Sequence, residues 1–206
     1  MWQRGSSTSE FSVSRFYKQP QDKKGNSIEE LVWSPSEQTV FAAGDTSGHI
    51  CIFDTRAPSK VMLSTRISNT DVNVLAWNDH VSNLLASGCD DGEMCVWDLR
   101  KFAGKEASSP LARFTYSNTP ITSLEWHPSD ESMLCVTDDI ATYLYDLSIE
   151  DDDVAKLSNE SSVPPQLLFL HCGSEMVKEA HWHKQIPSCV MTTSLTGLSV
   201  FIPSNL

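Results

Sequence analysis

Asp90 and Asp91, followed by Gly92, are the residues of this sequence whose types and spacing come closest to a catalytic site. Two neighbouring carboxylates can serve as general acid and base when their surroundings separate their pKa values. The same three residue types also build tight turns, because glycine adopts positive φ and aspartate caps nearby backbone N–H groups. The acid–base interpretation predicts an enzyme, whereas the turn interpretation predicts only a structural role for these residues.

A second group of residues has side chains that can bind a metal. His181 and His183 share one face of a predicted strand, and His171, Cys172 and Cys189 lie nearby in the sequence. Their spacing matches no zinc pattern, so we predict no metal site. The sequence also contains no P-loop, no G-x-G-x-x-G and no G-x-S-x-G, so we expect neither a cofactor nor a catalytic residue.

An internal repeat decides between the two interpretations of the aspartate pair. Trp33, Trp77, Trp126 and Trp182 lie 44, 49 and 56 residues apart, and each ends a strand of alternating residues. Each is followed by a polar corner, a strand of small apolar residues, a tight turn and a third strand. A fourth strand follows the first three of these units. Four short strands in a period of about 40 residues are typical of a β-propeller blade.

The aspartate pair occupies the tight turn between the second and third strands of its repeat. The corresponding residues of the four repeats are GDTSG (44–48), CDDG (89–92), TDDIA (137–141) and SLTG (194–197). A position filled by Asp, Ser, Thr and Gly in successive hairpins is a turn position. We therefore predict that Asp90 and Asp91 are turn residues and that the chain is not an enzyme; a hydrolase built on a propeller is a weak alternative.

The repeats define the expected fold, which is all-β with about four propeller blades. We divide the chain into an outer strand and linker of an incomplete preceding blade (1–26), three repeats (27–66, 67–115 and 116–171) and a degenerate last repeat (172–206). The blades are expected to belong to a larger propeller; a closed four-blade ring and the pairing of two copies are the alternatives. The predicted core of the repeats comprises Trp33, Trp77, Trp97, Asp98, Trp126 and Trp182.

The charge of the chain restricts its partners. The 206 residues include 27 Asp and Glu against 15 Lys and Arg, which gives a net charge of −12. Such a surface repels nucleic acid and attracts basic proteins. No apolar run reaches the ~18 residues of a membrane helix, and the N-terminus has no secretory apolar region. We therefore expect an intracellular protein whose six cysteines are free thiols.

Two groups of residues are candidates for contacting a basic partner. The first belongs to an acidic insertion at 148–165, which is longer than the other connections and ends in a stiff proline pair. Its predicted binding residues are Glu150, Asp151, Asp152, Asp153, Glu160, Pro164 and Pro165. The second group lies four residues before each repeated tryptophan, where propellers place residues near the rim of the central channel. These residues are Glu29, Asn73, Thr122 and Lys178.

Several motifs resemble those of a known family. VWDLR (96–100), IFDTR (52–56) and YLYDL (143–147) resemble WD repeats, which implies a propeller that acts as a non-catalytic scaffold. QLLFLHCG (166–173) followed by HWH (181–183) is similar to the glutamate-rich WD-repeat proteins. That resemblance implies a nucleolar chaperone for a basic ribosomal protein in assembly of the large ribosomal subunit, with Glu150–Asp153 and the proline pair gripping the client. Nuclear histone-binding WD-repeat proteins of the retinoblastoma-binding kind, which serve chromatin assembly, are the alternative.

Overall fold

The described part of the chain is built from β-strands. A computed structural model describes residues 2–4, 11–13, 26–57, 60–102, 109–150 and 163–205. Within these ranges there is no α-helix, and the single 3₁₀-helix, η1, spans Leu99–Lys101. No helix of these ranges is long and apolar enough to cross a membrane. The prediction of an all-β propeller fold is therefore confirmed.

Four antiparallel sheets form the body of the structure, and each sheet corresponds to one repeat of the sequence. The first sheet contains β3 (Ile28–Trp33), β4 (Val40–Asp45), β5 (His49–Asp54) and β6 (Val61–Arg66). The second contains β7 (Val72–Trp77), β8 (Leu84–Cys89), β9 (Met94–Asp98) and β10 (Ala112–Phe114). The third contains β11 (Ile121–Trp126), β12 (Met133–Asp138), β13 (Ala141–Asp146) and β14 (Leu167–Cys172). The last contains β15 (Glu179–Trp182), β16 (Val190–Ser194) and β17 (Gly197–Phe201), and a separate hairpin pairs β1 (Trp2–Arg4) with β2 (Phe11–Val13).

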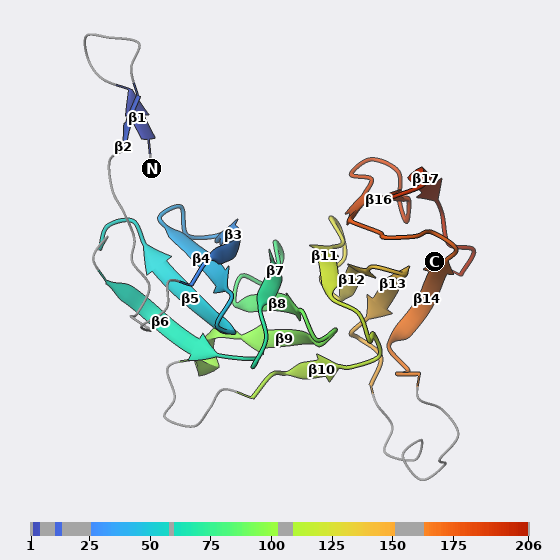
Figure 1. The fold of residues 1–206 in the computed structure, drawn as a ribbon, viewed down its shortest axis with the longest axis horizontal. Helices are drawn as coiled ribbons and strands as arrows, with labels where there is room; N and C mark the ends of the chain where they lie inside the picture. The colour runs from blue at the N-terminus through green and yellow to red at the C-terminus, as the bar shows by residue number, and fades with distance from the viewer. Residues whose placement is uncertain are drawn as a thin grey trace.

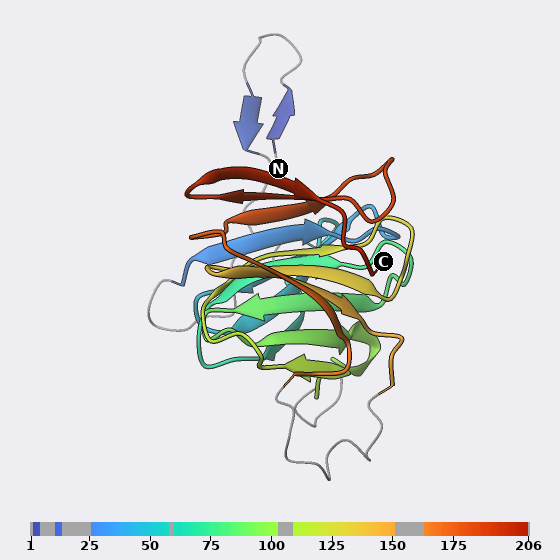
Figure 2. The same cartoon turned by 90° about the vertical axis from the view of Figure 1, so that its right-hand side faces the viewer.

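The four sheets follow one another around an arc (Figure 1), and the view turned by 90° shows them packed as successive layers (Figure 2). The first strand of each sheet packs against the first strand of the next, as β3 does on β7, β7 on β11 and β11 on β15. Three of the four clusters of the hydrophobic core each lie between two consecutive sheets. The fourth, Ala43, Cys51 and Phe53, lies on the other face of the first sheet. Because the middle strands β8 and β9 have a neighbouring sheet on both faces, nearly all of their residues are buried.

The repeated tryptophans hold the same place in the four sheets. Trp33, Trp77, Trp126 and Trp182 each end the first strand, opposite Phe41, Leu85, Leu134 and Val190 of the second strand. The indole Nε1–H of Trp126 donates to the backbone oxygen of Ala76, at 3.0 Å, and that of Trp182 donates to the oxygen of Glu125, at 3.1 Å. Each of these indoles thus fixes its sheet to the preceding one.

The prediction that Trp33 lies in the core is wrong. Its side chain is 54% exposed, whereas Trp77, Trp126 and Trp182 are each less than 10% exposed. The physical reason is its position in the arc: β7 packs on the other face of the first sheet, so no sheet of the described arc lies against Trp33. Trp97 is buried as expected, and its Nε1–H donates to the hydroxyl of Ser87 at 2.8 Å.

The turn between the second and third strands has the conformation that its residue types predict. Gly48 and Gly92 have φ of 80° and 81° in the first two sheets. A Cβ atom at Gly92 would lie 2.7 Å from the backbone oxygen of Ser117. The close approach of the loop between β10 and β11 therefore also requires glycine at position 92. The Asp91 carboxylate accepts from the backbone N–H of Glu93, at 3.1 Å. Asp91 therefore performs the capping role of a turn residue.

Removing the indole of Trp126 should destabilise the fold strongly. Trp126→Ala deletes a large aromatic from the layer between the second and third sheets, and we expect a loss of about 3–5 kcal/mol in the free energy of unfolding. Trp126→Phe should cost less, about 1–3 kcal/mol, because it keeps most of the apolar volume and loses the bond to Ala76. Leu111→Ala, at a half-exposed position, is the control and should change stability by less than about 0.5 kcal/mol. Denaturant unfolding measures all three; a near-native midpoint for Trp126→Ala would show that the packing is misassigned.

Candidate protein-binding surface

One end of the sheets concentrates acidic side chains. We call this end the turn face; it carries the turns between second and third strands together with the beginnings of the first strands. The turn face includes Glu29, Asp71, Asp90, Asp91, Asp139 and Glu175. The cations on or beside it include Lys178, Arg66 and Arg113, which lies 3.4 Å from the carboxylate of Glu93. Backbone bonds hold its segments together, since the N–H of Asp90 donates to the oxygen of Asp71 at 3.0 Å. The turn face is therefore a predominantly negative surface on a rigid framework.

Asn73 and Thr122, two of the predicted rim residues, join neighbouring sheets. Glu29, Asn73 and Thr122 are each the extra residue of a β-bulge in the first strand, because the pairing register shifts across them. A bulge redirects a side chain out of the regular alternation. The amide of Asn73 donates to the backbone oxygen of Ile121, at 3.3 Å, and the hydroxyl of Thr122 donates to that of Val177, at 3.0 Å. These side chains therefore stabilise the arc, a role that the sequence analysis missed.

The other two predicted rim residues remain on the surface. Lys178 is exposed, and its ammonium group lies 3.1 Å from the carboxylate of Asp139 in the preceding sheet. Glu29 is also exposed, and its carboxylate accepts from the hydroxyl of Ser27. The repeat register thus placed the four residues correctly at one level. Glu29 and Lys178 are exposed, whereas Asn73 and Thr122 are half-buried between neighbouring sheets.

The acidic insertion leaves the sheets at the end opposite the turn face. Glu150 is exposed, and Asp151, Asp152, Asp153 and Glu160 lie outside the described residues. Pro164 accepts from the backbone N–H of Leu167, at 3.0 Å, so it lies in a turn that leads into β14. The side chain of Gln166 donates to the oxygen of Ile149, at 2.9 Å, which holds the two ends of the insertion together. Glu150, Pro164 and Pro165 therefore lie at the end of the sheets opposite the predicted rim residues.

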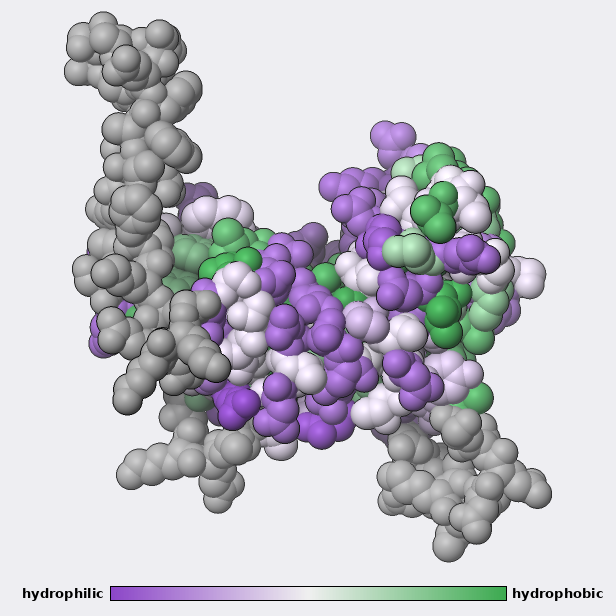
Figure 3. All heavy atoms as spheres, in the orientation of Figure 1, coloured by the Kyte–Doolittle hydropathy of each residue, from purple (hydrophilic) through white to green (hydrophobic). Residues whose placement is uncertain are grey.

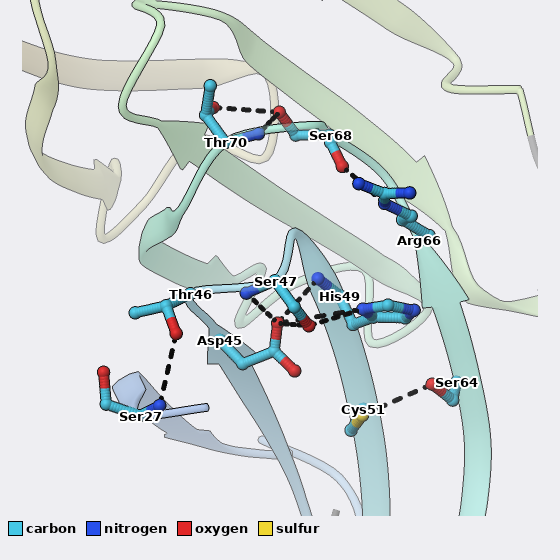
Figure 4. Close-up of polar contacts among 10 residues, drawn as sticks. All are labelled: Ser27, Asp45, Thr46, Ser47, His49, Cys51, Ser64, Arg66, Ser68 and Thr70. Carbon is cyan, nitrogen blue, oxygen red and sulfur yellow. Dashed lines mark hydrogen bonds and ion pairs between the residues drawn. The ribbon is translucent and has the colours of Figure 1, made fainter. Parts of the chain in front are cut away.

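The first sheet contains serine, histidine and aspartate in contact, but their arrangement is that of a turn. The Asp45 carboxylate accepts from the hydroxyl of Ser47 at 2.8 Å and from the backbone N–H of His49 at 2.9 Å, as Figure 4 shows. The Ser47 hydroxyl lies between the two other groups, 2.8 Å from His49 Nδ1. In a catalytic triad the histidine lies between serine and aspartate and removes the serine proton. Here Ser47 donates to Asp45, so the cluster caps its turn.

The third sheet buries the carboxylate of Asp138, a predicted turn residue whose burial the sequence analysis did not foresee. Asp138 is fully buried and accepts from the hydroxyls of Ser117 and Tyr143, both at 2.6 Å. It also accepts from the backbone N–H groups of Ile140 and Ala141, both at 2.8 Å. Burial, together with the bond to Asp138, raises the pKa of Tyr143. Four hydrogen bonds therefore satisfy the Asp138 carboxylate. The turn of the third sheet has no glycine, and Asp138 stabilises it instead.

Two arginines at the end opposite the turn face hold the aspartates that follow the third strands. Arg100 donates to both oxygens of Asp98, with a shortest distance of 2.7 Å, and Arg56 does the same with Asp54 at 2.6 Å. The hydrogen bonds from Arg100 lower the pKa of Asp98 to about 2, and those from Arg56 lower the pKa of Asp54 to about 2. Asp98 also accepts from the backbone N–H of Arg100, and so caps η1.

The described residues offer no arrangement typical of a metal or thiol enzyme. Within the described ranges, no group of three His, Cys, Asp or Glu side chains could hold a metal ion. All six cysteines are free, and burial raises the pKa of Cys89 to about 12 and also raises the pKa of Cys51. A thiol of raised pKa is a poor nucleophile at neutral pH.

Comparisons with known proteins agree with this architecture. The WD40 domain of anaphase-promoting complex subunit 4 defines a family profile that matches residues 8–80. A chain in the crystal structure of the mitotic checkpoint complex superposes with a TM-score of 0.67, over 88% of this chain and 49% of that one, at 17% identity. The chain belongs to the WD-repeat β-propeller proteins. The resemblance of its motifs to WD repeats is therefore confirmed.

Curated WD-repeat relatives are considerably longer than this chain. It is 46% identical to the ribosome assembly protein rrb1 of Schizosaccharomyces pombe, over 84% of this chain and 38% of that protein. It is 41% identical to the protein HEAT STRESS TOLERANT DWD 1 of Arabidopsis thaliana and to the glutamate-rich WD repeat-containing protein 1 of Dictyostelium discoideum. Each of these matches covers 87% of this chain, and the chain spans about two fifths of the length of the three relatives.

A pair of isosteric substitutions tests the role of Thr122. Thr122→Val removes the hydroxyl that bonds Val177 and also lies 2.8 Å from the buried hydroxyl of Thr137, and it should lower the free energy of unfolding by about 1–2 kcal/mol. Thr142→Val is the matched control in the same sheet, because the hydroxyl of Thr142 is buried without a hydrogen-bond partner. We expect Thr142→Val to be neutral or stabilising by up to about 1 kcal/mol. Equal effects of both changes in denaturant unfolding would contradict the proposed inter-sheet bond.

The Asp98–Arg100 pair predicts a particular dependence of stability on pH. Because the pKa of folded Asp98 is about 2, below its ordinary value, the pair stabilises the fold above about pH 4. That contribution should disappear as the pH falls from about 4 to about 2. Asp98→Asn and Arg100→Leu should each flatten the pH dependence of the unfolding free energy in this window, and the double variant should flatten it no further. An unchanged slope in both single variants would show that the pair does not stabilise the fold.

Proposed function

We propose that the chain is a non-catalytic scaffold that binds a basic protein during assembly of the large ribosomal subunit, in the nucleolus. The observation that carries this proposal is the similarity to the fission yeast ribosome assembly protein over 84% of the chain. A net charge of −12 and an acidic turn face on a rigid arc agree with a cationic client. Ribosomal proteins and histones are both basic proteins that an acidic surface attracts. The similarity to the fission yeast ribosome assembly protein favours a ribosomal protein.

The physics of such binding is electrostatic attraction combined with a few desolvated contacts. A negative face steers a cationic partner and raises the association rate. Exposed ion pairs each contribute only about 0.2–1 kcal/mol, so affinity also requires apolar contacts. Glu29, Asp90 and Asp91 supply charge on the turn face, Glu150 and Pro164-Pro165 supply charge and a stiff apolar segment at the opposite end, and Asp151–Asp153 add charge to the sequence of the insertion. A client that contacts both ends would wrap around the outer edge of the sheets.

Charge-neutral variants test which end binds. Asp90→Asn with Asp91→Asn keeps the turn, because the amide oxygen at position 91 can still accept from Glu93. Because this double variant removes two exposed charges, we expect client binding to weaken roughly 2- to 30-fold at low salt, with a flatter dependence on salt. Asp79→Asn with Glu131→Gln removes two exposed charges from the strand connections at the other end and serves as the control. Neutralising Asp151, Asp152 and Asp153 together tests the insertion.

The binding assay should use the complete chain with salt-extracted large-subunit ribosomal proteins and, in parallel, with core histones. The proposal predicts capture of one or a few ribosomal proteins and a measurable loss with the turn-face or insertion variant. Exclusive, salt-resistant capture of core histones would contradict it and support the chromatin-assembly alternative. Identical salt dependence of all variants would show that neither acidic group contacts the client.

A further inference from the structure

Three exposed apolar side chains lie on the turn face of the third and last sheets. Ile140 belongs to the β12–β13 turn, Met176 to the connection between β14 and β15, and Leu195 to the β16–β17 turn. Their side chains are 56%, 48% and 69% exposed. Figure 3 shows hydrophobic residues on the surface around β16 and β17, the strands that the turn of Leu195 joins.

Backbone hydrogen bonds bring the segments of these three residues together. The N–H of Val177 donates to the oxygen of Asp139 at 3.2 Å, and the N–H of Leu195 donates to the oxygen of Glu175 at 2.9 Å. Both turns are therefore bonded to the residues that flank Met176. Met176 itself has φ of 52°, which is uncommon for a residue other than glycine, and the two bonds fix the chain on either side of it. We call the three exposed residues on these adjoining segments the apolar patch.

The corresponding positions of the first two sheets show that apolar residues are not needed to build the turn face. The turns there consist of Thr46–Gly48 and Asp90–Gly92, which are polar or glycine. Asp71 lies six residues before its repeated tryptophan, the position that Met176 holds in the last repeat. An apolar side chain exposed on a turn buries little surface in this fold. Adjoining exposed apolar residues surrounded by charge are instead typical of a protein interaction site.

Acidic side chains lie beside the apolar patch. Glu175, next to Met176 in the chain, is exposed. The ammonium group of Lys178 lies 3.1 Å from the carboxylate of Asp139 and offsets its charge. The exposed turn residue Asp90 continues the negative charge over the second sheet. The turn face therefore combines apolar side chains on the last two sheets with negative charge next to them, and a complementary partner carries apolar side chains flanked by basic ones.

We propose that the apolar patch binds a segment of the client in which large apolar side chains are flanked by lysine or arginine. This proposal rests on the proposed function, because it takes the occupant to be part of the basic client. Exposed charges steer association but add little affinity, whereas desolvated apolar contacts dominate it. Met176 suits such a contact because its flexible, polarisable side chain adapts to its partner. The patch lies on turns and not on a face between sheets, so its role does not depend on any sheet that adjoins the described arc.

Two synthetic peptides of equal length and equal positive charge test the patch. One carries leucine and phenylalanine among its lysines, and the other carries serine at those positions. We expect the complete chain to bind the apolar peptide roughly tenfold or more tightly than the serine peptide, measured by fluorescence anisotropy. A triple variant, Ile140→Ser with Met176→Asn and Leu195→Thr, should abolish this difference and leave the salt dependence unchanged. Asparagine at position 176 tolerates the positive φ.

A matched control separates the patch from apolar surface in general. Ile186 is 46% exposed in the β15–β16 connection, at the end of the last sheet opposite the turn face. Ile186→Ser should keep the difference between the two peptides. All the substituted side chains are exposed, so the variants should remain folded, which circular dichroism checks. Retention of the difference in the triple variant, with its loss after Leu198→Ser and Val200→Ser, would place the contact on the outer face of the last sheet and overturn the proposal.

Capture of ribosomal proteins distinguishes failure of the patch from failure of the proposed function. If the triple variant captures the client as tightly as the wild type does, the patch does not bind it, and the proposed function stands without this site. If the peptides behave as expected but no ribosomal protein is captured, the client is wrong and the patch remains a site for apolar segments flanked by basic residues. Equal binding of both peptides to the wild-type chain would overturn the role of the patch.

Discussion

Face-to-face packing of consecutive sheets is the constraint on which the rest of this structure depends. A single four-stranded sheet has two apolar faces and cannot bury either of them alone. Each sheet therefore depends on packing against a neighbour, and in the third and last sheets the repeated tryptophan fixes the spacing through its apolar ring and its indole N–H. The bulge residues Asn73 and Thr122 add polar contacts at the same joints. The arc is consequently a rigid support for its turns, and its last sheet leaves the apolar side chains of Met191, Leu198 and Val200 exposed.

The repeat made most of the fold predictable from sequence, and the remainder depended on neighbours in space. Alternation and spacing located the strands, and the residues of the turn position correctly predicted Asp91 and Gly92 as a corner. The same reasoning placed Trp33 in the core, because periodicity shows which face a residue occupies but not whether another sheet covers that face. The repeat also placed Asp138 in a turn, but it could not predict its burial, because Ser117 lies in a separate segment that only the fold brings to it.

Prediction of the candidate binding residues from sequence had a similar limit. Register correctly placed Glu29, Asn73, Thr122 and Lys178 at one level, but it could not show that two of them are bulge residues bonded to the next sheet. The acids of the turn face were visible in the sequence as turn residues, and their grouping on one surface emerged from the arrangement of the sheets. A rigid framework with negative turns is suited to binding. The identity of a basic client then depends on how charge and apolar contacts are distributed between the two ends.

The most direct test of this account is the rate of hydrogen exchange at the indole N–H groups, resolved by nuclear magnetic resonance. If consecutive sheets are joined as described, the indole protons of Trp126 and Trp182 exchange orders of magnitude more slowly than those of a free indole, because exchange requires neighbouring sheets to separate. Exchange of both protons at the rate of an exposed indole would contradict the packing from which the turn face, the insertion and the two ends of the arc all derive their positions.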